Sequence, residues 1–429
     1  MPTILNFLIY HTPLFYLVQS LWRDEAFSFF MAKPGPLQII INTANDFNPP
    51  LYYLLLHFWM IVAGHRDEAL RLLSLVFHIL TAYTAFKFSQ KVFSRRFAYF
   101  VLLFTLFNPM LVYYAFEMRM YSLYAFLTIA SLYFIYFKNW KWYTLSAVMG
   151  LYTHSFFPLI IASYTIYYWA TKQLNKKNFL LIFKPVLFYL PWLPVIISQF
   201  FHSQNSWLFP VDLQLVTSVL GNLFTNYEGT PGGLWRYTFF LSLLIFYFLY
   251  LARKRFQKKS LIFLIPIFIP LALILGYSSI KQPLYVNRYL IFVTVFEIMG
   301  ISLGVWCIKN KLTRSVWAAF WLMLVVYVNL FLPRYLKKTD FKSTFLEINR
   351  ISTRSDSVFA KTPIGFLESA YYNNFPEKTY IYNPDNIKIP NYIGTTLVFP
   401  NASKSSFPPS PSRTFLIQDD AGFEVVINN

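Results

Sequence analysis

The chain has 429 residues, of which 56% are hydrophobic, 21% aromatic and 13% charged. The charged share is about half of that in an average soluble domain, which excludes a soluble enzyme. The 37 Lys and Arg residues outnumber the 18 Asp and Glu residues, but they lie in short clusters between apolar runs. They form no basic face, so nucleic acid is excluded as a partner. The single cysteine, Cys307, excludes a disulfide framework and a Cys-based metal site.

Apolar runs of membrane-spanning length recur along the chain. A bilayer core of ~30 Å needs about 20 apolar helical residues. About 11 such spans are predicted, which begin near residues 3, 69, 97, 119, 142, 156, 178, 235, 261, 288 and 315. The two spans within 142–171 are short and meet at Tyr152-Thr153-His154, so a single re-entrant or tilted pair is an alternative there. The first run lacks the basic n-region and the cleavage site of a signal peptide and is counted as a span.

The loops after every second predicted span are basic, and these loops include 87–96, 172–177, 253–259 and 309–314. The positive-inside rule places them and the N-terminus in the cytoplasm, and an odd number of spans places the C-terminus outside. On this topology none of the 18 acidic residues is in a cytoplasmic loop, and only Glu297 lies within a span. Chemistry that uses carboxylates is therefore expected at the extracytoplasmic face of the cell membrane.

The first outer loop, residues 22–68, carries several of these acids. It opens with Trp22-Arg23-Asp24-Glu25-Ala26-Phe27-Ser28 and continues through Asn45-Asp46-Phe47-Asn48-Pro49-Pro50. Paired carboxylates at the end of a span are costly in lipid, so they face water, a partner charge or a substrate. An interfacial turn is the simpler interpretation of Asp24-Glu25. Residues 51–60, after the proline pair, predict an amphipathic or re-entrant helix at the interface.

Residues 336–429 differ in composition from the rest of the chain. They hold half of all acidic residues, are rich in Ser, Asn and Pro, and contain no run of span length. Short apolar segments at 357–360, 379–382 and 414–417 predict strands, residues 341–351 predict a helix, and 403–412 predict a loop. The predicted fold class is an all-α polytopic membrane protein, with a transmembrane domain at 1–335 and a small extracytoplasmic α/β domain at 336–429.

Four spaced motifs resemble a known family. They are Trp22-x-Asp-Glu-Ala-Phe-Ser, then Asp46-x-Asn-Pro-Pro-Leu-Tyr-Tyr-Leu-Leu-Leu-His, then Gly64 with Glu68-Ala-Leu-Arg-Leu-Leu-Ser, and Tyr113-Tyr114 with Glu117-x-Arg-Met-Tyr. The pattern resembles polyprenyl-phosphate-dependent glycosyltransferases of the GT-C fold, above all the bacterial relatives of protein O-mannosyltransferases and aminoarabinose transferases. It is dense over residues 22–125 and sparse later, where Thr153-His154 and Asn287-Arg288-Tyr289-Leu290 fit in the same order.

The resemblance implies transfer of a sugar from a polyprenyl-phosphate donor by an inverting reaction, in which an acceptor hydroxyl or amine attacks the anomeric carbon. The attack needs a carboxylate to accept a proton. Asp24 is the candidate base, with Glu25 as a positioning or structural neighbour. The leaving phosphate needs fixed positive charge, for which Arg119 and Arg288 are the candidates. Anchoring at the membrane interface by snorkelling is the structural alternative for both arginines.

The other candidate substrate-binding residues are Asp46, Glu117, Tyr121, His154 and Tyr289. Asp46 precedes the Pro-Pro pair and is a candidate to orient the acceptor or a divalent metal ion. Asn48 stands where relatives often have His or Lys, which weakens a metal or phosphate contact there. Glu117 has ion pairing as its alternative role, and a lone His such as His154 is more often structural. The cofactor is therefore unknown, with a divalent metal ion as one candidate.

The predicted function is a membrane glycosyltransferase whose partners are a polyprenyl-phosphate-linked sugar donor, an acceptor lipid, glycan or protein, and membrane lipids. The cytoplasmic loops carry no P-loop, Asp-x-Asp pair or Gly-rich phosphate cradle for a nucleotide donor. Two alternatives stay open. A polytopic transporter or lipid flippase would use Glu297 and the outer acids for ions or head groups, and a non-catalytic envelope scaffold would act through residues 336–429.

Overall fold

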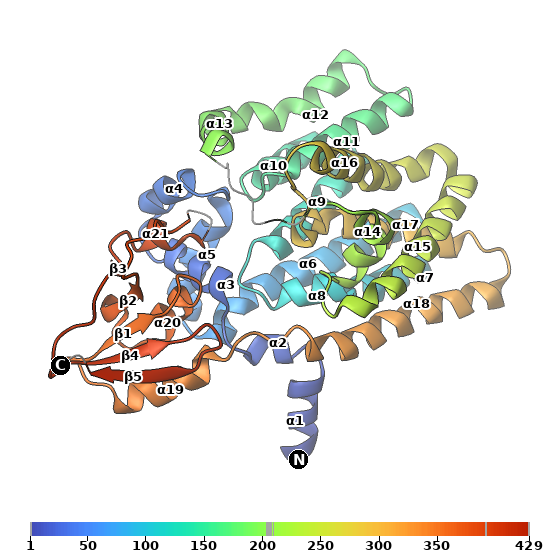
Figure 1. Ribbon diagram of the computed structural model, residues 1–429. Helices are drawn as coiled ribbons and strands as arrows, with labels where there is room; N and C mark the ends of the chain where they lie inside the picture. The colour runs from blue at the N-terminus through green and yellow to red at the C-terminus, as the bar shows by residue number, and fades with distance from the viewer. Residues whose placement is uncertain (1, 203–207, 209, 391–392, 428–429) are drawn as a thin grey trace. The chain divides into compact units, whose positions relative to one another are not determined.

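The computed structural model of the protein (Figure 1) describes residues 2–202, 208, 210–390 and 393–427. The chain divides into two compact units. The first unit comprises residues 1–14 and 71–335, and the second comprises 15–70 and 336–429. Most of the first outer loop thus packs with the C-terminal segment, although nearly 270 residues separate them along the chain.

The first unit is a bundle of helices around α17 (Ile291–Trp306). α17 is buried along nearly its whole length and packs against α7, α9, α15 and α16. The other helices are α1 (Pro2–His11), α6 (Asp67–Val92), α7 (Arg95–Leu106), α8 (Pro109–Ala115), α9 (Tyr121–Tyr136), α10 (Trp140–Leu151), α11 (Phe157–Ala170), α12 (Lys176–Tyr189), α13 (Leu193–His202), α14 (Leu213–Thr225), α15 (Trp235–Phe256), α16 (Leu261–Ile280) and α18 (Lys311–Phe331). A helix with no polar face is expected only in such a central position.

Within the described residues, five helical stretches are long and apolar enough to cross a membrane: 67–92, 176–199, 232–280, 287–306 and 311–334. The third has 49 residues, and at ~1.5 Å per residue it would be about twice as long as a bilayer core. It contains α15 and α16, which the 3-10 turn η3 (Gln257–Ser260) separates, and both helices pack against α17. We therefore count it as two spans. α7 and α8 meet the same criteria only when taken together, and the bend of 57° between them is that of a broken span or a re-entrant loop.

The count of eleven spans is not confirmed. Helices occur where spans were expected near 119, 142 and 156, but they have 16, 12 and 14 residues, fewer than the ~20 that a perpendicular crossing needs. The span expected from residue 3 is not one continuous helix. α1 ends at His11 and the four-residue α2 (Phe15–Val18) follows. Pro13 explains the break, because proline cannot donate to the helix ladder and disfavours helical backbone before it.

The C-terminal segment of the second unit contains a five-stranded sheet in the order β3-β2-β1-β4-β5. β1 (Ser357–Ala360), β2 (Thr379–Tyr382), β3 (Ser403–Lys404) and β4 (Arg413–Ile417) are parallel, and β5 (Phe423–Ile427) runs antiparallel along β4 at the sheet edge (Figure 1). α19 (Phe341–Ile351) covers the sheet with Phe341, Phe345 and Ile348, which pack on Val358 and Phe415. The predicted α/β character, the helix and three of the strands are confirmed.

The N-terminal segment of the second unit is helical. It contains α3 (Arg23–Ala32), α4 (Pro36–Ala44) and α5 (Leu51–Ala63). The helix predicted after Pro50 is confirmed as α5. The simpler interpretation of Asp24-Glu25, a turn, does not hold, because both residues lie in the first turn of α3. α3 packs against α20 (Phe366–Tyr372) and α21 (Thr395–Val398) of the C-terminal segment. Burial of its apolar side chains there explains why this short helix forms.

Polar contacts reinforce the same association. Asp67 is 6% exposed and accepts hydrogen bonds from the hydroxyls of Tyr371 at 2.9 Å and Tyr372 at 2.8 Å. The Nζ of Lys342 lies 3.1 Å from the Asp67 carboxylate and 3.2 Å from that of Glu68. A buried carboxylate is tolerated when it is paired and hydrogen-bonded in this way. These contacts hold the end of the first outer loop to α19 and α20.

Candidate functional site

Glu25 lies in a buried ion pair. Its carboxylate Oε2 is 2.8 Å from the Nζ of Lys338, and the two side chains are 0% and 7% exposed. The same oxygen accepts a hydrogen bond from the backbone N–H of Trp22 at 3.4 Å. A buried carboxylate that already has a cation and a backbone donor is less suited to accept a substrate proton than an accessible one. Its contacts therefore favour a structural role for Glu25, which fixes the first turn of α3.

Asp24 is in a different environment from its neighbour. Its side chain is 17% exposed, and its Oδ1 lies 3.6 Å from the Nε of Arg23. The backbone carbonyl of Asp24 accepts a hydrogen bond from the Ser28 hydroxyl at 2.9 Å, one turn further along α3. The backbone of Asp24 is thus held by the helix while the side chain keeps access to solvent. Of the two adjacent acids, Asp24 is the one suited to accept a proton from a substrate.

Asp46 stabilises a turn between α4 and α5. Its Oδ2 accepts hydrogen bonds from the backbone N–H of Asn48 at 3.4 Å and from the Asn48 side-chain amide at 3.3 Å. This is an Asx-type turn, in which a side-chain oxygen replaces a backbone acceptor. Asp46 is only 9% exposed. These contacts give Asp46 a structural role in the turn that precedes Pro49-Pro50. A role in substrate binding stays a prediction.

The first unit holds the two predicted arginines. Arg119 is 6% exposed and Arg288 is 9% exposed. A snorkelling arginine carries its guanidinium to water, so this burial argues against simple interfacial anchoring. Arg119 lies between α8 and α9, with its guanidinium 5.8 Å from the Tyr121 ring centre, and Arg288 lies in the 3-10 turn η4 (Asn287–Leu290), with its guanidinium 5.8 Å from the Tyr289 ring.

Aromatic rings link the residues beside Arg119 to those beside Arg288. His154, in the turn between α10 and α11, has its ring centre 6.3 Å from that of Tyr121 and 5.3 Å from that of Tyr289. It stacks on Tyr124 at 4.5 Å with an interplanar angle of 6°. Its Nδ1 accepts a hydrogen bond from the Phe156 backbone N–H at 3.1 Å. This fixes the neutral tautomer with the proton on Nε2, which makes His154 a hydrogen-bond donor.

Glu117 belongs to the same group of residues. It is 1% exposed, and its backbone carbonyl accepts a hydrogen bond of 2.6 Å from the hydroxyl of Ser74 on α6. The charges that act on the Tyr114 hydroxyl come from Glu228, Glu117 and Arg288. The Tyr114 ring also contacts that of Tyr121 at 4.8 Å. Six predicted residues thus gather in the first unit, namely Glu117, Arg119, Tyr121, His154, Arg288 and Tyr289.

In each of the two units, residues that lie near predicted site residues were not themselves predicted. Lys338, the partner of Glu25, follows the last predicted span without any motif. Glu228 lies after α14, in a segment where Asn226 and Gly229 have positive φ angles of 60° and 98°. Glu368, on α20, exerts an electrostatic effect on Asp24 from more than 300 residues away. Only Tyr114 carried a sequence signal, because it precedes Glu117 within a motif.

No group of three or more His, Cys, Asp and Glu side chains that could hold a metal ion occurs among the described residues. Asp46, the residue considered for a metal, is engaged in its own turn. A divalent metal ion is therefore not confirmed, and we assign no chemical step to a metal.

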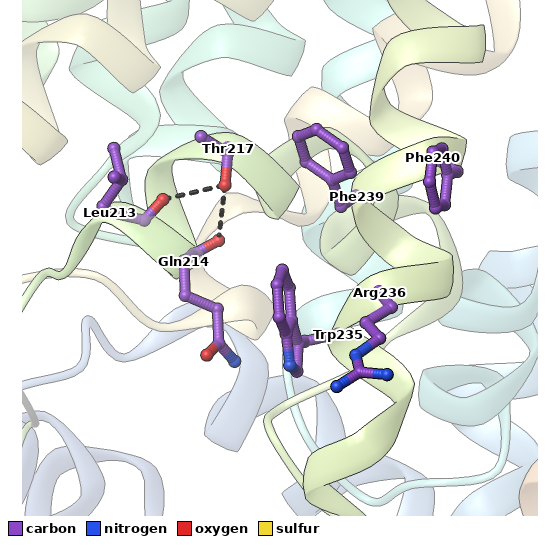
Figure 2. A pocket seen from close by; sticks show the side chains of 7 residues that line it. All are labelled: Leu213, Gln214, Thr217, Trp235, Arg236, Phe239 and Phe240. Atoms are coloured by element: carbon purple, nitrogen blue, oxygen red, sulfur yellow. Dashed lines mark hydrogen bonds between the residues drawn. The ribbon is translucent and has the colours of Figure 1, made fainter.

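An apolar groove of about 500 Å³ lies between α14 and α15 of the first unit. Figure 2 shows Phe239 and Phe240 at one end, with the side chains of Gln214 and Arg236 directed toward the other. The Thr217 hydroxyl donates to the carbonyls of Leu213 and Gln214, at 2.8 and 3.2 Å, rather than facing a ligand. Such walls suit a lipid chain. None of the groove's lining residues belongs to the predicted site.

Comparison with known proteins identifies the fold. No family model and no curated protein matches the chain. Among solved structures, ArnT from Cupriavidus metallidurans superimposes with a TM-score of 0.59 in the apo state and 0.60 bound to undecaprenyl phosphate, at 10% and 11% identity. The alignments cover 97% of this chain and 92–93% of ArnT. An Archaeoglobus fulgidus oligosaccharyltransferase, in a complex with Zn and sulfate, gives a TM-score of 0.51 at 11% identity over 84% of this chain and 58% of that chain.

These likenesses confirm the GT-C fold that the motifs indicated. Together with the long apolar helices, they place the chain among multi-pass membrane proteins. At 10–11% identity they establish the architecture, and the roles of individual side chains rest on the geometry described above.

Proposed function

We propose that the protein is a membrane glycosyltransferase that moves a sugar from a polyprenyl-phosphate donor to an acceptor hydroxyl or amine at the extracytoplasmic face. One observation carries the proposal: Arg119 and Arg288 are buried beside the rings of Tyr121 and Tyr289, with His154 near both rings, in a chain with the fold of ArnT. Arginine side chains bind phosphate groups through charge-assisted hydrogen bonds. A lipid phosphate is an anion that such a site is built to hold.

In this mechanism Asp24 accepts the proton of the attacking hydroxyl. The new bond forms between the acceptor oxygen and the anomeric carbon, while the bond from that carbon to the lipid-phosphate oxygen breaks. Attack from the face opposite the phosphate inverts the anomeric configuration. Asp24 suits the task because its side chain keeps solvent access on a fixed helical turn. A positioned base of this kind contributes about 10²- to 10⁴-fold in rate.

Arg119 and Arg288 stabilise the charge that accumulates on the leaving phosphate. Preorganised cations are most effective in a site shielded from water, because no solvent has to reorganise during the reaction. The ring contacts of Tyr121 and Tyr289 hold the two guanidinium groups in place. The Nε2–H group of His154 donates a hydrogen bond to the sugar or to the phosphate. Glu117 is the acidic group of this cluster, and its charge and that of Arg288 both act on Tyr114.

The proposal is tested by mass spectrometry of envelope glycans, glycolipids and glycoproteins from a strain that lacks the gene. We expect one sugar to disappear from one class of acceptor and to return with the wild-type gene. An unchanged set of envelope glycans would contradict the proposal. Ion- or gradient-dependent uptake by vesicles, without covalent transfer, would favour a transporter instead.

A further inference from the structure

The apolar groove between α14 and α15 has one polar end. Figure 2 shows the amide of Gln214, the indole nitrogen of Trp235 and the guanidinium of Arg236 at that end, all directed away from Phe239 and Phe240. In the described part of the chain, none of these three side-chain groups forms a hydrogen bond or an ion pair. The polar end thus offers a positive charge and several N–H donors to a molecule in the groove.

Close packing of α14 on α15 fixes the shape of the groove. The backbone N–H of Gly221 donates a hydrogen bond of 2.8 Å to the Ser242 hydroxyl, which donates in turn to the Thr238 carbonyl at 2.9 Å. A Cβ atom on Gly221 would lie only 2.1 Å from that carbonyl oxygen, so no side chain fits at this contact. The groove's lining residues on α14 all precede the contact. The protein itself therefore sets the shape of the groove, which lowers the cost of binding.

The groove lies at one end of a membrane-crossing stretch. Trp235 and Arg236 are the first residues of α15, close to the start of the apolar stretch 232–280. Trp and Arg are typical anchors of such helices at the interface between membrane and water. Phe239 and Phe240 lie about one helical turn further along, and Phe240 is 65% exposed. The polar end is therefore expected at the level of the lipid head groups, with the phenyl rings at the level of the lipid chains.

The donors at the polar end fit a phosphate group. Arginine binds phosphate through charge-assisted and often bidentate hydrogen bonds, and amide and indole N–H groups add further donors. The described residues that line the groove include no Asp or Glu. The nearest acid on the α14 side is Asp212, whose Oδ1 accepts a hydrogen bond from the Leu215 backbone N–H at 2.7 Å and so caps α14. A zwitterionic head group would bring a second cation to Arg236 without a counter-charge, so an anionic head group is favoured.

We propose that this groove binds an anionic phospholipid of the bilayer, with the lipid phosphate at Arg236 and an acyl chain along Phe239 and Phe240. A polyprenyl phosphate shares the phosphate chemistry. Under the proposed function, however, its phosphate lies beside Arg119 and Arg288, and neither of these arginines lines the groove. The groove is therefore assigned to a structural lipid, which fills the space between α14 and α15 and takes no part in sugar transfer.

The test measures lipid affinity by native mass spectrometry of the full-length protein, which is first delipidated in detergent micelles. The probes are a phosphatidylglycerol, which is anionic, a zwitterionic phosphatidylcholine with the same acyl chains, and undecaprenyl phosphate. Arg236→Gln removes the positive charge and keeps a polar side chain. Arg253→Gln is the matched control, because it removes a positive charge from an exposed position on the same helix, outside the groove.

Arg236→Gln should bind the phosphatidylglycerol about tenfold more weakly than the wild type, as expected when a charge-assisted contact to phosphate is lost. Its affinities for the other two lipids should change less than about twofold, and so should all three affinities of the control. Equal losses of phosphatidylglycerol binding in Arg236→Gln and Arg253→Gln would overturn the proposal. A loss in Arg236→Gln that is confined to undecaprenyl phosphate would overturn it as well, in favour of a polyprenyl lipid.

A second measurement uses thermal unfolding in the same micelles. Phosphatidylglycerol should raise the unfolding temperature of the wild type and of Arg253→Gln, because a ligand that binds only the folded state stabilises it. The rise should be smaller in Arg236→Gln and in Thr217→Phe, which places a ring in the groove and leaves every charge unchanged. Equal rises in all four proteins would contradict the proposal. Neither measurement involves sugar transfer, so the lipid site and the proposed function can each fail while the other stands.

Discussion

The Nζ of Lys338 lies 2.8 Å from the carboxylate of Glu25, and both side chains are shielded from solvent. The ammonium group also lies 5.6 Å from the centre of the Trp22 ring. A single residue just beyond the last helix of the first unit thus fixes the acid next to the proposed base. The acidic pair Asp24-Glu25 is therefore divided into one structural and one accessible carboxylate.

Replacement of Glu25 by Gln should lower the stability of the protein by about 3–5 kcal/mol, because it leaves the Lys338 ammonium buried without a counter-charge. Thermal unfolding of the full-length protein measures this. The double variant Glu25→Gln, Lys338→Met should recover much of the loss, since no unpaired charge remains. A Glu25→Gln variant as stable as the wild type would show that the pair contributes little.

Replacement of Arg119 or Arg288 by Ala should reduce kcat for sugar transfer by about 10²- to 10³-fold, as expected when a fixed donor to a developing charge is removed. Lysine at position 119 should restore only part of the rate, because it lacks the planar fork of arginine. Arg66→Ala is the matched control, since that side chain is 87% exposed. Equal rates in the control and in Arg119→Ala would remove Arg119 from the site.

Glu297 separates the enzyme from the transporter alternative. It is 0% exposed within α17, and its carboxylate oxygens have no hydrogen-bond partner in the described structure. In a transporter an intramembrane acid would handle ions or head groups. In the proposed enzyme it has no chemical part, so Glu297→Gln, which keeps the size of the side chain, should transfer sugar within about twofold of the wild-type rate. A complete loss of function in this variant would favour the transporter.

The C-terminal segment contains the ion pair Asp356–Arg413, which should make the stability of this segment depend on pH in the acidic range. Burial raises the pKa of Asp356, but hydrogen bonds from Arg413 and Thr353 outweigh this effect and lower it from 3.8 to about 2. Because the folded-state pKa is depressed, the stabilisation is complete above pH ~4 and is lost as the pH falls through about 2.

Asp356→Asn should therefore cost about 1–2 kcal/mol at pH 7, a value that allows for the partial exposure of Arg413. The difference from the wild type should shrink between pH 4 and pH 2. Thermal unfolding across this pH range measures it, with Asp385→Asn at an exposed position as the control. A difference that is independent of pH would show that the ion pair is not its source.

The sequence predicted those strands and helices whose own residues show a clear apolar pattern. The strands around Val358, Tyr380 and Phe415 and the helix at 341–351 alternate or repeat their apolar residues clearly. α3 was missed because its burial comes from residues in the C-terminal segment, such as Phe399, whose ring lies 4.8 Å from that of Phe30. A helix of ten residues with apolar side chains on all its faces carries no periodic signal of its own.

The same distinction applies to the candidate site. Arg119, His154 and Arg288 could be named because motifs mark them. Lys338 and Glu368 could not, because each acts on α3 from a segment more than 300 residues away and belongs to no motif. The number of spans is not confirmed, because apolar composition does not distinguish a helix of 12–16 residues, as in α9 and α10, from one that crosses the bilayer.

The role of Asp24 as the base in sugar transfer is measured most directly with purified protein in proteoliposomes. The donor is a labelled pool from the strain that lacks the gene. Asp24→Asn is compared with Asp385→Asn, the same substitution at an exposed position. We expect Asp24→Asn to lose about 10²- to 10⁴-fold in kcat while the control keeps the wild-type rate. Transfer by Asp24→Asn at the wild-type rate would contradict it.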